Sequence, residues 1–221
     1  MNIRLTRREL IQKSLAGFGA LSLPVALTAC GDDNENTAEN ALKVQFLHGV
    51  ASGDPLHDRI ILWTRLTPND NAARLEVVWE IASDEAFKQL VNTGKVQTNA
   101  AQDFTVKVDA DRLQAGTEYY YRFRFGNTVS AIGQTKTLPQ RSDQVKFAVC
   151  SCSNYPAGYF HVYKEMAQEN NLDVIIHLGD YIYEYGQGGY ATDDAKQLGR
   201  TFAADNDKEI IKLDDYRKRY A

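Results

Sequence analysis

A cysteine, an aspartate and a tyrosine are the residues of this chain whose types and spacing could do chemistry together. Cys152 lies two residues after the end of an apolar run, Val145–Cys150. Asp180 and Tyr183 follow a second apolar run, Asp173–Leu178, in the stretch "HLGDYIYEYG". Thiolate, carboxylate and phenolate are all anionic when deprotonated, so three of them at one point repel one another unless a cation lies among them. The sequence therefore predicts a metal site, provided that the two runs end side by side.

The order of elements around these residues predicts that the two apolar runs do end side by side. Both apolar runs are continuous, which is typical of strands buried on both faces of a parallel sheet. Residues 158–170 have helical spacing, so strand, helix and strand predict a right-handed βαβ unit. Sites in such sheets form outside the carboxyl ends of the strands, and neighbouring strands lie about 5 Å apart. Cys152 and Asp180 can then reach a common point, with Gly179 allowing the backbone to turn.

Each of these residues also has an ordinary structural interpretation. Cys152 alone could be a packed or capping cysteine, and Asp180 alone could cap a turn. Cys150 is expected to be a small buried hydrophobe, and a disulfide between Cys150 and Cys152 would be strained. His177 is expected to be a core histidine with satisfied nitrogens rather than a ligand. The tyrosines of "YIYEY" could simply cover the edge of the sheet.

The preceding part of the chain, residues 42–140, predicts an all-β sandwich of the fibronectin III or immunoglobulin type. Arg59–Thr64 and Leu75–Ile81 are rich in β-branched and aromatic residues. The clearest strand is "TEYYYRFRF", in which four aromatic residues alternate with polar ones and are expected to face the core: Tyr119, Tyr121, Phe123 and Phe125. The fold class is therefore mixed, with this sandwich followed by an incomplete α/β segment over residues 144–221.

Residues 1–30 have the pattern of an export signal, and residues 31–41 that of a solvated tether. Arg7 and Arg8 precede a short apolar run and resemble a twin-arginine signal, whose machinery exports folded proteins. "LTAC", ending at Cys30, resembles a lipobox, which implies lipidation of Cys30; an ordinary cleaved signal is the alternative. The expected location is the periplasm or the cell surface, with a lipid anchor to the membrane at Cys30.

Composition limits the remaining function classes. The chain has 221 residues, a net charge of −4 with mixed signs, and three cysteines. Nothing in this charge pattern predicts nucleic-acid binding, and three cysteines do not make a disulfide framework.

Four segments resemble the PhoD-type alkaline phosphatase family, in which a twin-arginine signal and a β-sandwich precede a calcineurin-like metallophosphoesterase domain. They are "HGVASGDPLHDRIILWTRL", "CSCSNYPAGYFHVYKEMA", "DVIIHLGDYIYEYG" and "LDDYRKRYA". Related calcineurin-like enzymes usually open with Asp-x-His, which is missing here, and Tyr183 lies where a further carboxylate is usual. This departure favours the PhoD branch.

The resemblance implies a ferric ion held by Cys152, Asp180 and Tyr183, with Asp180 bridging to a calcium ion. Anionic sulfur and phenolate oxygen suit Fe³⁺, and oxygen ligands suit Ca²⁺. Two such cations can clamp a phosphate ester and activate water, so the implied activity is hydrolysis of phosphodiesters, phosphomonoesters or both.

The resemblance also implies further ligands beyond Ala221, so we expect an N-terminal part of an enzyme that is inactive alone. The aspartates that follow the site are expected to be solvated rather than substitute ligands: Asp193, Asp194, Asp205, Asp207, Asp214 and Asp215. Two alternatives remain. One is a phospholipase D-type phosphodiesterase on the same scaffold, and the other is a non-enzymatic surface lipoprotein whose sandwich binds a partner.

Overall fold

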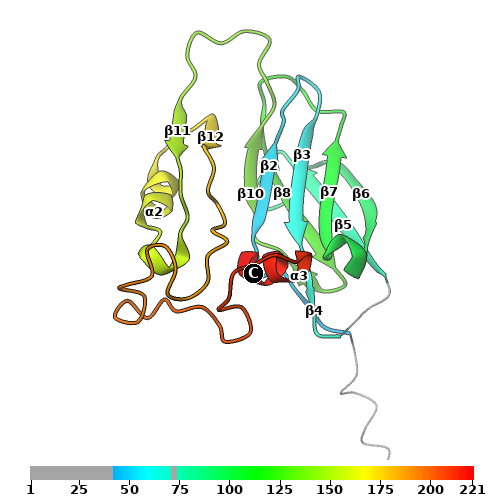
Figure 1. Ribbon diagram of the computed structural model, residues 1–221. Coiled ribbons are helices and arrows are strands. Elements are labelled where there is room, and N and C mark those ends of the chain that lie inside the picture. The colour runs from blue at the N-terminus through cyan, green and yellow to red at the C-terminus, as the bar shows by residue number, and fades with distance from the viewer. Residues whose placement is uncertain (1–41, 71–73) are drawn as a thin grey trace, which may run out of the picture. The chain divides into compact units, whose positions relative to one another are not determined.

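The computed structural model describes residues 42–70 and 74–221 (Figure 1). The predicted export signal, with Arg7, Arg8 and Cys30, and the predicted tether over residues 31–41 lie outside the described residues. In the part of the chain that is described, no helix is long and apolar enough to cross a membrane.

Antiparallel sheets form the first part of the described chain. One sheet has the order β2–β3–β7, a second has the order β10–β8–β5–β6 with β9 added beside β8, and β1 pairs with β4. The strands are β1 (Val44–Gln45), β2 (Val50–Gly53), β3 (Ile60–Arg65), β4 (Thr67–Pro68), β5 (Leu75–Ala82), β6 (Leu90–Thr98), β7 (Thr105–Ala110), β8 (Glu118–Phe125), β9 (Thr128–Val129) and β10 (Gly133–Lys136).

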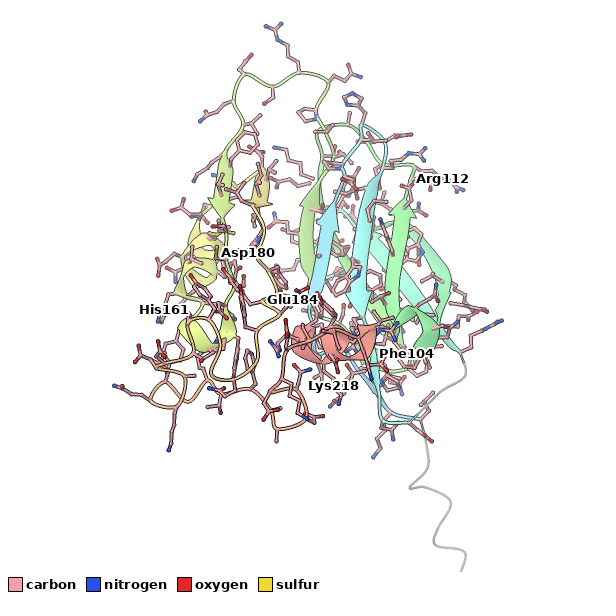
Figure 2. The ribbon with its side chains drawn as sticks, viewed as in Figure 1. Phe104, Arg112, His161, Asp180, Glu184 and Lys218 are labelled. Atoms are coloured by element: carbon pink, nitrogen blue, oxygen red, sulfur yellow. The ribbon has the colours of Figure 1, made fainter. Side chains whose placement is uncertain are left out.

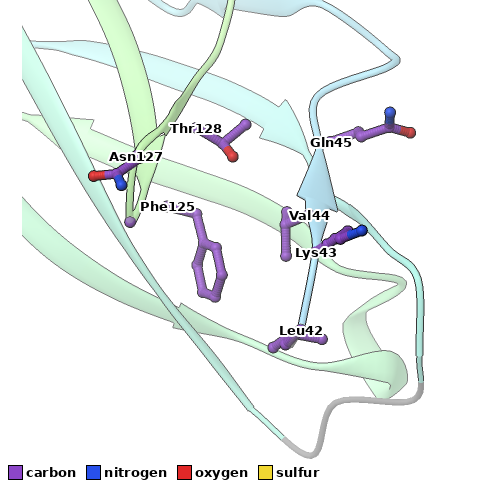
Figure 3. A pocket seen from close by; sticks show the side chains of 8 residues that line it. Leu42, Lys43, Val44, Gln45, Phe125, Asn127 and Thr128 are labelled. Atoms are coloured by element: carbon purple, nitrogen blue, oxygen red, sulfur yellow. The ribbon is translucent and has the colours of Figure 1, made fainter. Parts of the chain in front are cut away.

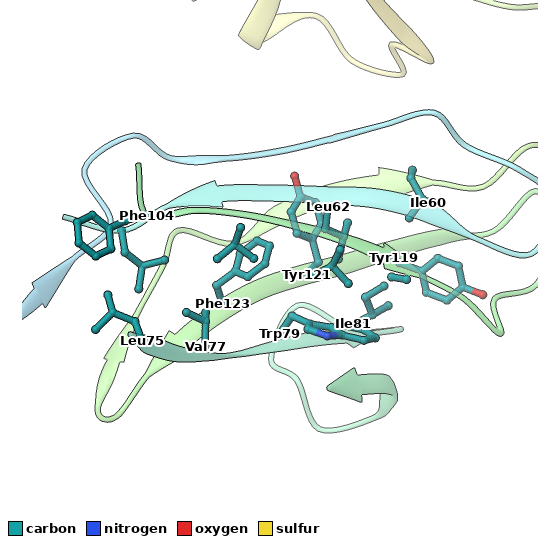
Figure 4. Close-up of a cluster of buried hydrophobic side chains, with 14 of the residues drawn as sticks. Ile60, Leu62, Leu75, Val77, Trp79, Ile81, Phe104, Tyr119, Tyr121 and Phe123 are labelled. Carbon is teal, nitrogen blue, oxygen red and sulfur yellow. The ribbon is translucent and has the colours of Figure 1, made fainter. Parts of the chain in front are cut away.

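The core of this sandwich is built by alternation along the strands (Figure 4). On β8, Tyr119, Tyr121 and Phe123 are at most 2 % exposed, and Phe125 packs partly buried against the same cluster. The predicted aromatic row is therefore core. Inward residues of β3, β5 and β7 complete the cluster: Ile60, Leu62, Leu75, Val77, Trp79, Ile81, Val106, Val108 and Ala110.

A buried carboxylate joins β5 to β8 on the other face of that sheet. Glu80 lies opposite Arg122 and accepts hydrogen bonds from Arg122 Nε at 2.6 Å and Arg124 Nη1 at 3.0 Å. The Arg122 guanidinium also lies 3.9 Å from the centre of the Phe87 ring. Burial opposes the ionisation of Glu80, but the two guanidinium groups outweigh it and hold the pKa of this carboxyl below its ordinary value of 4.5.

The second part of the chain contains the predicted parallel pair. β11 (Phe147–Cys150) and β12 (Val174–His177) are parallel, with Cys150 opposite His177. α2 (His161–Gln168) lies between them in the chain, and α3 (Leu213–Tyr220) ends it. Residues 178–212 between β12 and α3 contain neither α-helix nor strand. The element order of the βαβ prediction is present, although both strands and the helix are shorter than predicted.

The two strands are less buried than their apolar sequences predict. Phe147, Val149 and Ile175 are 54 %, 56 % and 61 % exposed. Parallel sheets are normally covered on both faces, and the described residues leave these side chains largely uncovered. The sandwich, by contrast, has a core of its own.

The paired Glu80 makes the stability of the sandwich depend on pH. A carboxyl whose pKa is depressed on folding stabilises the fold above its unfolded pKa, and this contribution is lost as the pH falls through the folded pKa. Glu80→Gln should lower the free energy of unfolding by about 1–3 kcal/mol near neutral pH, the usual cost of losing hydrogen bonds to a charged group. The free energy of unfolding of Glu80→Gln should also fall less steeply as the pH drops below 4.5, the ordinary pKa of this carboxyl.

Urea unfolding followed by tryptophan fluorescence measures this, because both tryptophans, Trp63 and Trp79, lie in the sandwich. Glu76→Gln is the matched control. Glu76 lies on the same strand but is half exposed and pairs with exposed Lys95, so its loss should change stability little. An equal effect of the two substitutions would contradict the role given to Glu80.

Candidate metal site

The pairing of the two strands continues past their ends into the loops that carry the candidate residues. The Cys152 N–H donates to the Gly179 carbonyl at 3.0 Å, and the Ser153 N–H donates to the Asp180 carbonyl at 2.8 Å. These two backbone hydrogen bonds hold the loop after β11 beside the loop after β12. The structure therefore brings Cys152 and Asp180 to the same carboxyl edge of the sheet, as the sequence predicts.

Both loops adopt backbone conformations that are uncommon for residues with a side chain. Cys152 has a φ of 65° and Asp180 a φ of 53°, both in the left-handed region. Gly179, whose carbonyl accepts the hydrogen bond from Cys152, has a φ of 122°. Only glycine adopts the last value readily. Left-handed residues other than glycine cost free energy and concentrate at functional sites. Nothing in the sequence signals the conformation of Cys152, because cysteine is not a residue that favours it.

Tyr183 completes the cluster. The nearby Cys152 thiol raises the pKa of the Tyr183 phenol far above its ordinary value; burial and the Asp180 carboxylate act in the same direction. In Figure 2, Asp180 lies beyond the end of β12, with Glu184 further along the same loop. The Cys152 thiol and the Asp180 carboxylate therefore both oppose the ionisation of the Tyr183 phenol, and a cation among the three side chains would reverse that effect.

The donor set fits a cation that accepts anionic sulfur and oxygen. Across residues 42–70 and 74–221, no three His, Cys, Asp or Glu side chains gather closely enough to hold a metal ion. The candidate cluster combines only two such side chains, Cys152 and Asp180, with the phenol of Tyr183. Thiolate with phenolate suits a transition metal such as iron rather than Mg²⁺ or Ca²⁺ alone, which prefer oxygen ligands.

Arg219 on α3 organises the long loop that carries Tyr183. Its Nη1 donates to the carbonyls of Tyr183 at 2.9 Å and Tyr185 at 3.0 Å, and its Nη2 donates to the carbonyl of Asn206 at 2.8 Å. The guanidinium lies 3.7 Å from the centre of the Phe202 ring. The sequence gives no sign of this role, because carbonyls of an irregular loop leave no pattern in it.

The aspartates after the site remain apart from it. Asp205 pairs with Lys218 at 2.8 Å and Asp214 with Arg217 at 3.6 Å, and both aspartates are exposed. Asp193 and Asp194 are exposed as well, while Asp207 and Asp215 are half-buried.

Two hollows lie in the described part of the chain, each of about 500 Å³. The one in Figure 3 is formed by residues 42–45 and 125–128 of the sandwich, and its only ionisable side chain is Lys43. It has no carboxylate, thiol, imidazole or phenol that could serve as a metal ligand. The other lies beside the loop of the candidate site and is lined by Ser153, Tyr181, Ile182, Arg219 and neighbouring aromatic residues.

Together these features define a two-part protein, a β-sandwich followed by the parallel strands of an α/β segment with an acidic cluster at their carboxyl edge. Two family profiles match it: "PhoD-like phosphatase, N-terminal domain" over residues 32–139 and "PhoD-like phosphatase" over residues 147–221. The chain belongs to the PhoD-like phosphatase family.

Two relatives agree with this. Alkaline phosphatase D of Bacillus subtilis (strain 168) is 41 % identical over 226 residues, which cover 97 % of this chain and 37 % of the relative. A solved structure described as "Structure of PhoD" is 43 % identical, with a TM-score of 0.71 over 79 % of this chain and 34 % of that one. The chain thus spans about a third of the length of each.

The electrostatic coupling within the cluster predicts how Tyr183 titrates without a metal. Because Cys152 is the main cause of the raised pKa of Tyr183, Cys152→Ala should bring that pKa down toward its ordinary value of 10. Asp180→Asn should lower it less. Ultraviolet difference titration at alkaline pH measures this, with Tyr183→Phe identifying the signal among the twelve tyrosines. A Tyr183 pKa that does not respond to Cys152→Ala would show that the two side chains are not neighbours.

Proposed function

We propose that this chain supplies one side of the metal centre of a phosphoric ester hydrolase that cleaves phosphodiesters, phosphomonoesters or both. The observation that supports this most directly is that backbone hydrogen bonds bring Cys152 and Asp180 to the carboxyl edge of two parallel strands, where both raise the pKa of the Tyr183 phenol. Membership of the PhoD-like phosphatase family points to the same chemistry.

In this proposal the three side chains would hold an iron ion as anions, and Asp180 would also help to hold a calcium ion. The two cations would supply Lewis acidity toward a phosphate ester and its attacking water. Cys152 and Asp180 both adopt left-handed backbone conformations at the sheet edge, and Arg219 donates to the carbonyl of Tyr183 in the loop that bears it. The role of the chain's own residues is thus to bind and orient.

We also propose that the 221-residue chain does not turn over substrate by itself. Calcium alone takes six to eight oxygen ligands, and the cluster offers three donor side chains for two cations. Weak metal binding without catalysis is the expected behaviour.

A chimera tests the proposed activity. Residues 1–221 are continued by the part of the Bacillus subtilis relative that follows its matched stretch, and hydrolysis of p-nitrophenyl phosphate and bis(p-nitrophenyl) phosphate is measured. The chimera should be active, and Tyr183→Phe should reduce kcat at least about tenfold, since it removes a metal donor. Asp180→Asn should reduce it further.

Tyr185→Phe is the matched control, because it makes the same chemical change in the same loop without touching the cluster. Equal activity of the Tyr183→Phe and Tyr185→Phe chimeras would contradict the proposal. A chimera that cleaves only phosphatidylcholine would favour the phospholipase D-type alternative, and a folded chimera without iron or activity would favour a non-enzymatic lipoprotein.

We propose, finally, that the protein is exported through the twin-arginine machinery and anchored by lipid on Cys30. The support is the sequence pattern at Arg7, Arg8 and Cys30. Cys30→Ser should move the protein from the membrane fraction into the soluble fraction, as measured by fractionation of expressing cells. Membrane association that persists in this variant would contradict the lipid anchor.

A further inference from the structure

His177 makes hydrogen bonds through both ring nitrogens, and only one of its tautomers fits them. The Gly179 N–H lies 3.2 Å from His177 Nδ1. A backbone N–H can only donate, so Nδ1 must accept and carries no proton. In the neutral ring the proton then lies on Nε2.

The Nε2 side of the ring faces two hydroxyl groups from other parts of the segment. The Tyr163 hydroxyl of α2 lies 3.0 Å from Nε2, and Ser153 Oγ lies 3.2 Å from it. These two hydroxyls also hydrogen bond to each other. Ser153 is buried, so its hydroxyl depends on these partners rather than on water. Nε2–H can donate to either oxygen, and this matches the tautomer required on the Nδ1 side.

The His177 ring therefore links three segments of the chain next to Asp180. It joins α2 and the loop after β11 to Gly179, the residue before Asp180. The two backbone bonds described above, from Cys152 to Gly179 and from Ser153 to Asp180, lie in the same turn. We infer that His177, as the Nε2–H tautomer, is a positioning residue that holds the Gly179–Asp180 turn in its left-handed conformation. The inference rests on the proposed function only for the role given to Asp180.

The tautomer can be measured directly in the intact 221-residue chain without any metal. Long-range proton–nitrogen NMR of histidine-labelled protein distinguishes Nδ1–H from Nε2–H, and the signal absent from His177→Asn identifies His177 among the four histidines. We expect a proton on Nε2 and none on Nδ1. A proton on Nδ1 would overturn the inference.

Two substitutions then separate the two sides of the ring. His177→Asn keeps an acceptor near Nδ1, whereas His177→Gln places its amide near Nε2 and leaves the Gly179 N–H without an acceptor. Hydrogen exchange of the Gly179, Cys152 and Ser153 amides should stay close to that of the unsubstituted chain in His177→Asn. In His177→Gln it should accelerate about two- to tenfold, the effect of one lost hydrogen bond.

The Leu178 amide, which donates to the Cys150 carbonyl at 2.8 Å, is the internal control and should exchange equally in all three proteins. His177→Phe keeps a ring of similar size but no nitrogen. If packing alone mattered, His177→Phe would protect the turn as well as histidine does, and that result would overturn the inference. Because no readout uses iron or activity, a failure here leaves the proposed metal site standing, and an inactive chimera leaves this inference standing.

Discussion

The parallel pairing of β11 and β12 is the constraint on which the candidate site depends. Parallel strands end at the same edge, so Cys152 and Asp180, which are 28 positions apart in the chain, are brought together there. The pairing continues for two hydrogen bonds past the strands, and both loops then turn through left-handed residues. A slip in register of β12 against β11 would separate the thiol from the carboxylate, whatever the rest of the chain did.

That arrangement is electrostatically unfavourable without a cation, and the surroundings of the cluster maintain it. Cys152 and Asp180 both raise the pKa of Tyr183, so without a metal this phenol loses its proton only at a more alkaline pH than an ordinary tyrosine. His177 and Arg219 act on the backbone rather than on the charges: one contacts the turn before Asp180, the other the carbonyl of Tyr183. Fixed backbone around mutually repelling side chains is the condition under which a bound cation gains most, because little reorganisation is needed.

The fold class and the convergence of Cys152 and Asp180 could be predicted from the sequence. The contacts and backbone conformations that hold these residues in place could not. Alternation on β8 and continuous apolar runs at β11 and β12 are periodic signals, so the sandwich core and the parallel pair could be predicted. The exposure of Phe147, Val149 and Ile175 could not be, since an apolar run indicates a buried strand without saying what covers it. Arg219 was missed for a related reason: its partners are carbonyls, which every residue carries. The left-handed conformation of Cys152 leaves no signal in the sequence, because cysteine is not a residue that favours this region.

We propose that Tyr183 binds iron as a phenolate, and resonance Raman spectroscopy of the ferric-loaded chain tests this most directly. Excitation in a tyrosinate-to-iron absorption band enhances phenolate ring vibrations only when a tyrosine is a ligand. We expect these vibrations in the unsubstituted chain and in Tyr185→Phe, and their loss in Tyr183→Phe. Identical enhanced phenolate bands in Tyr183→Phe, or their absence from an unsubstituted chain that has bound iron, would contradict it.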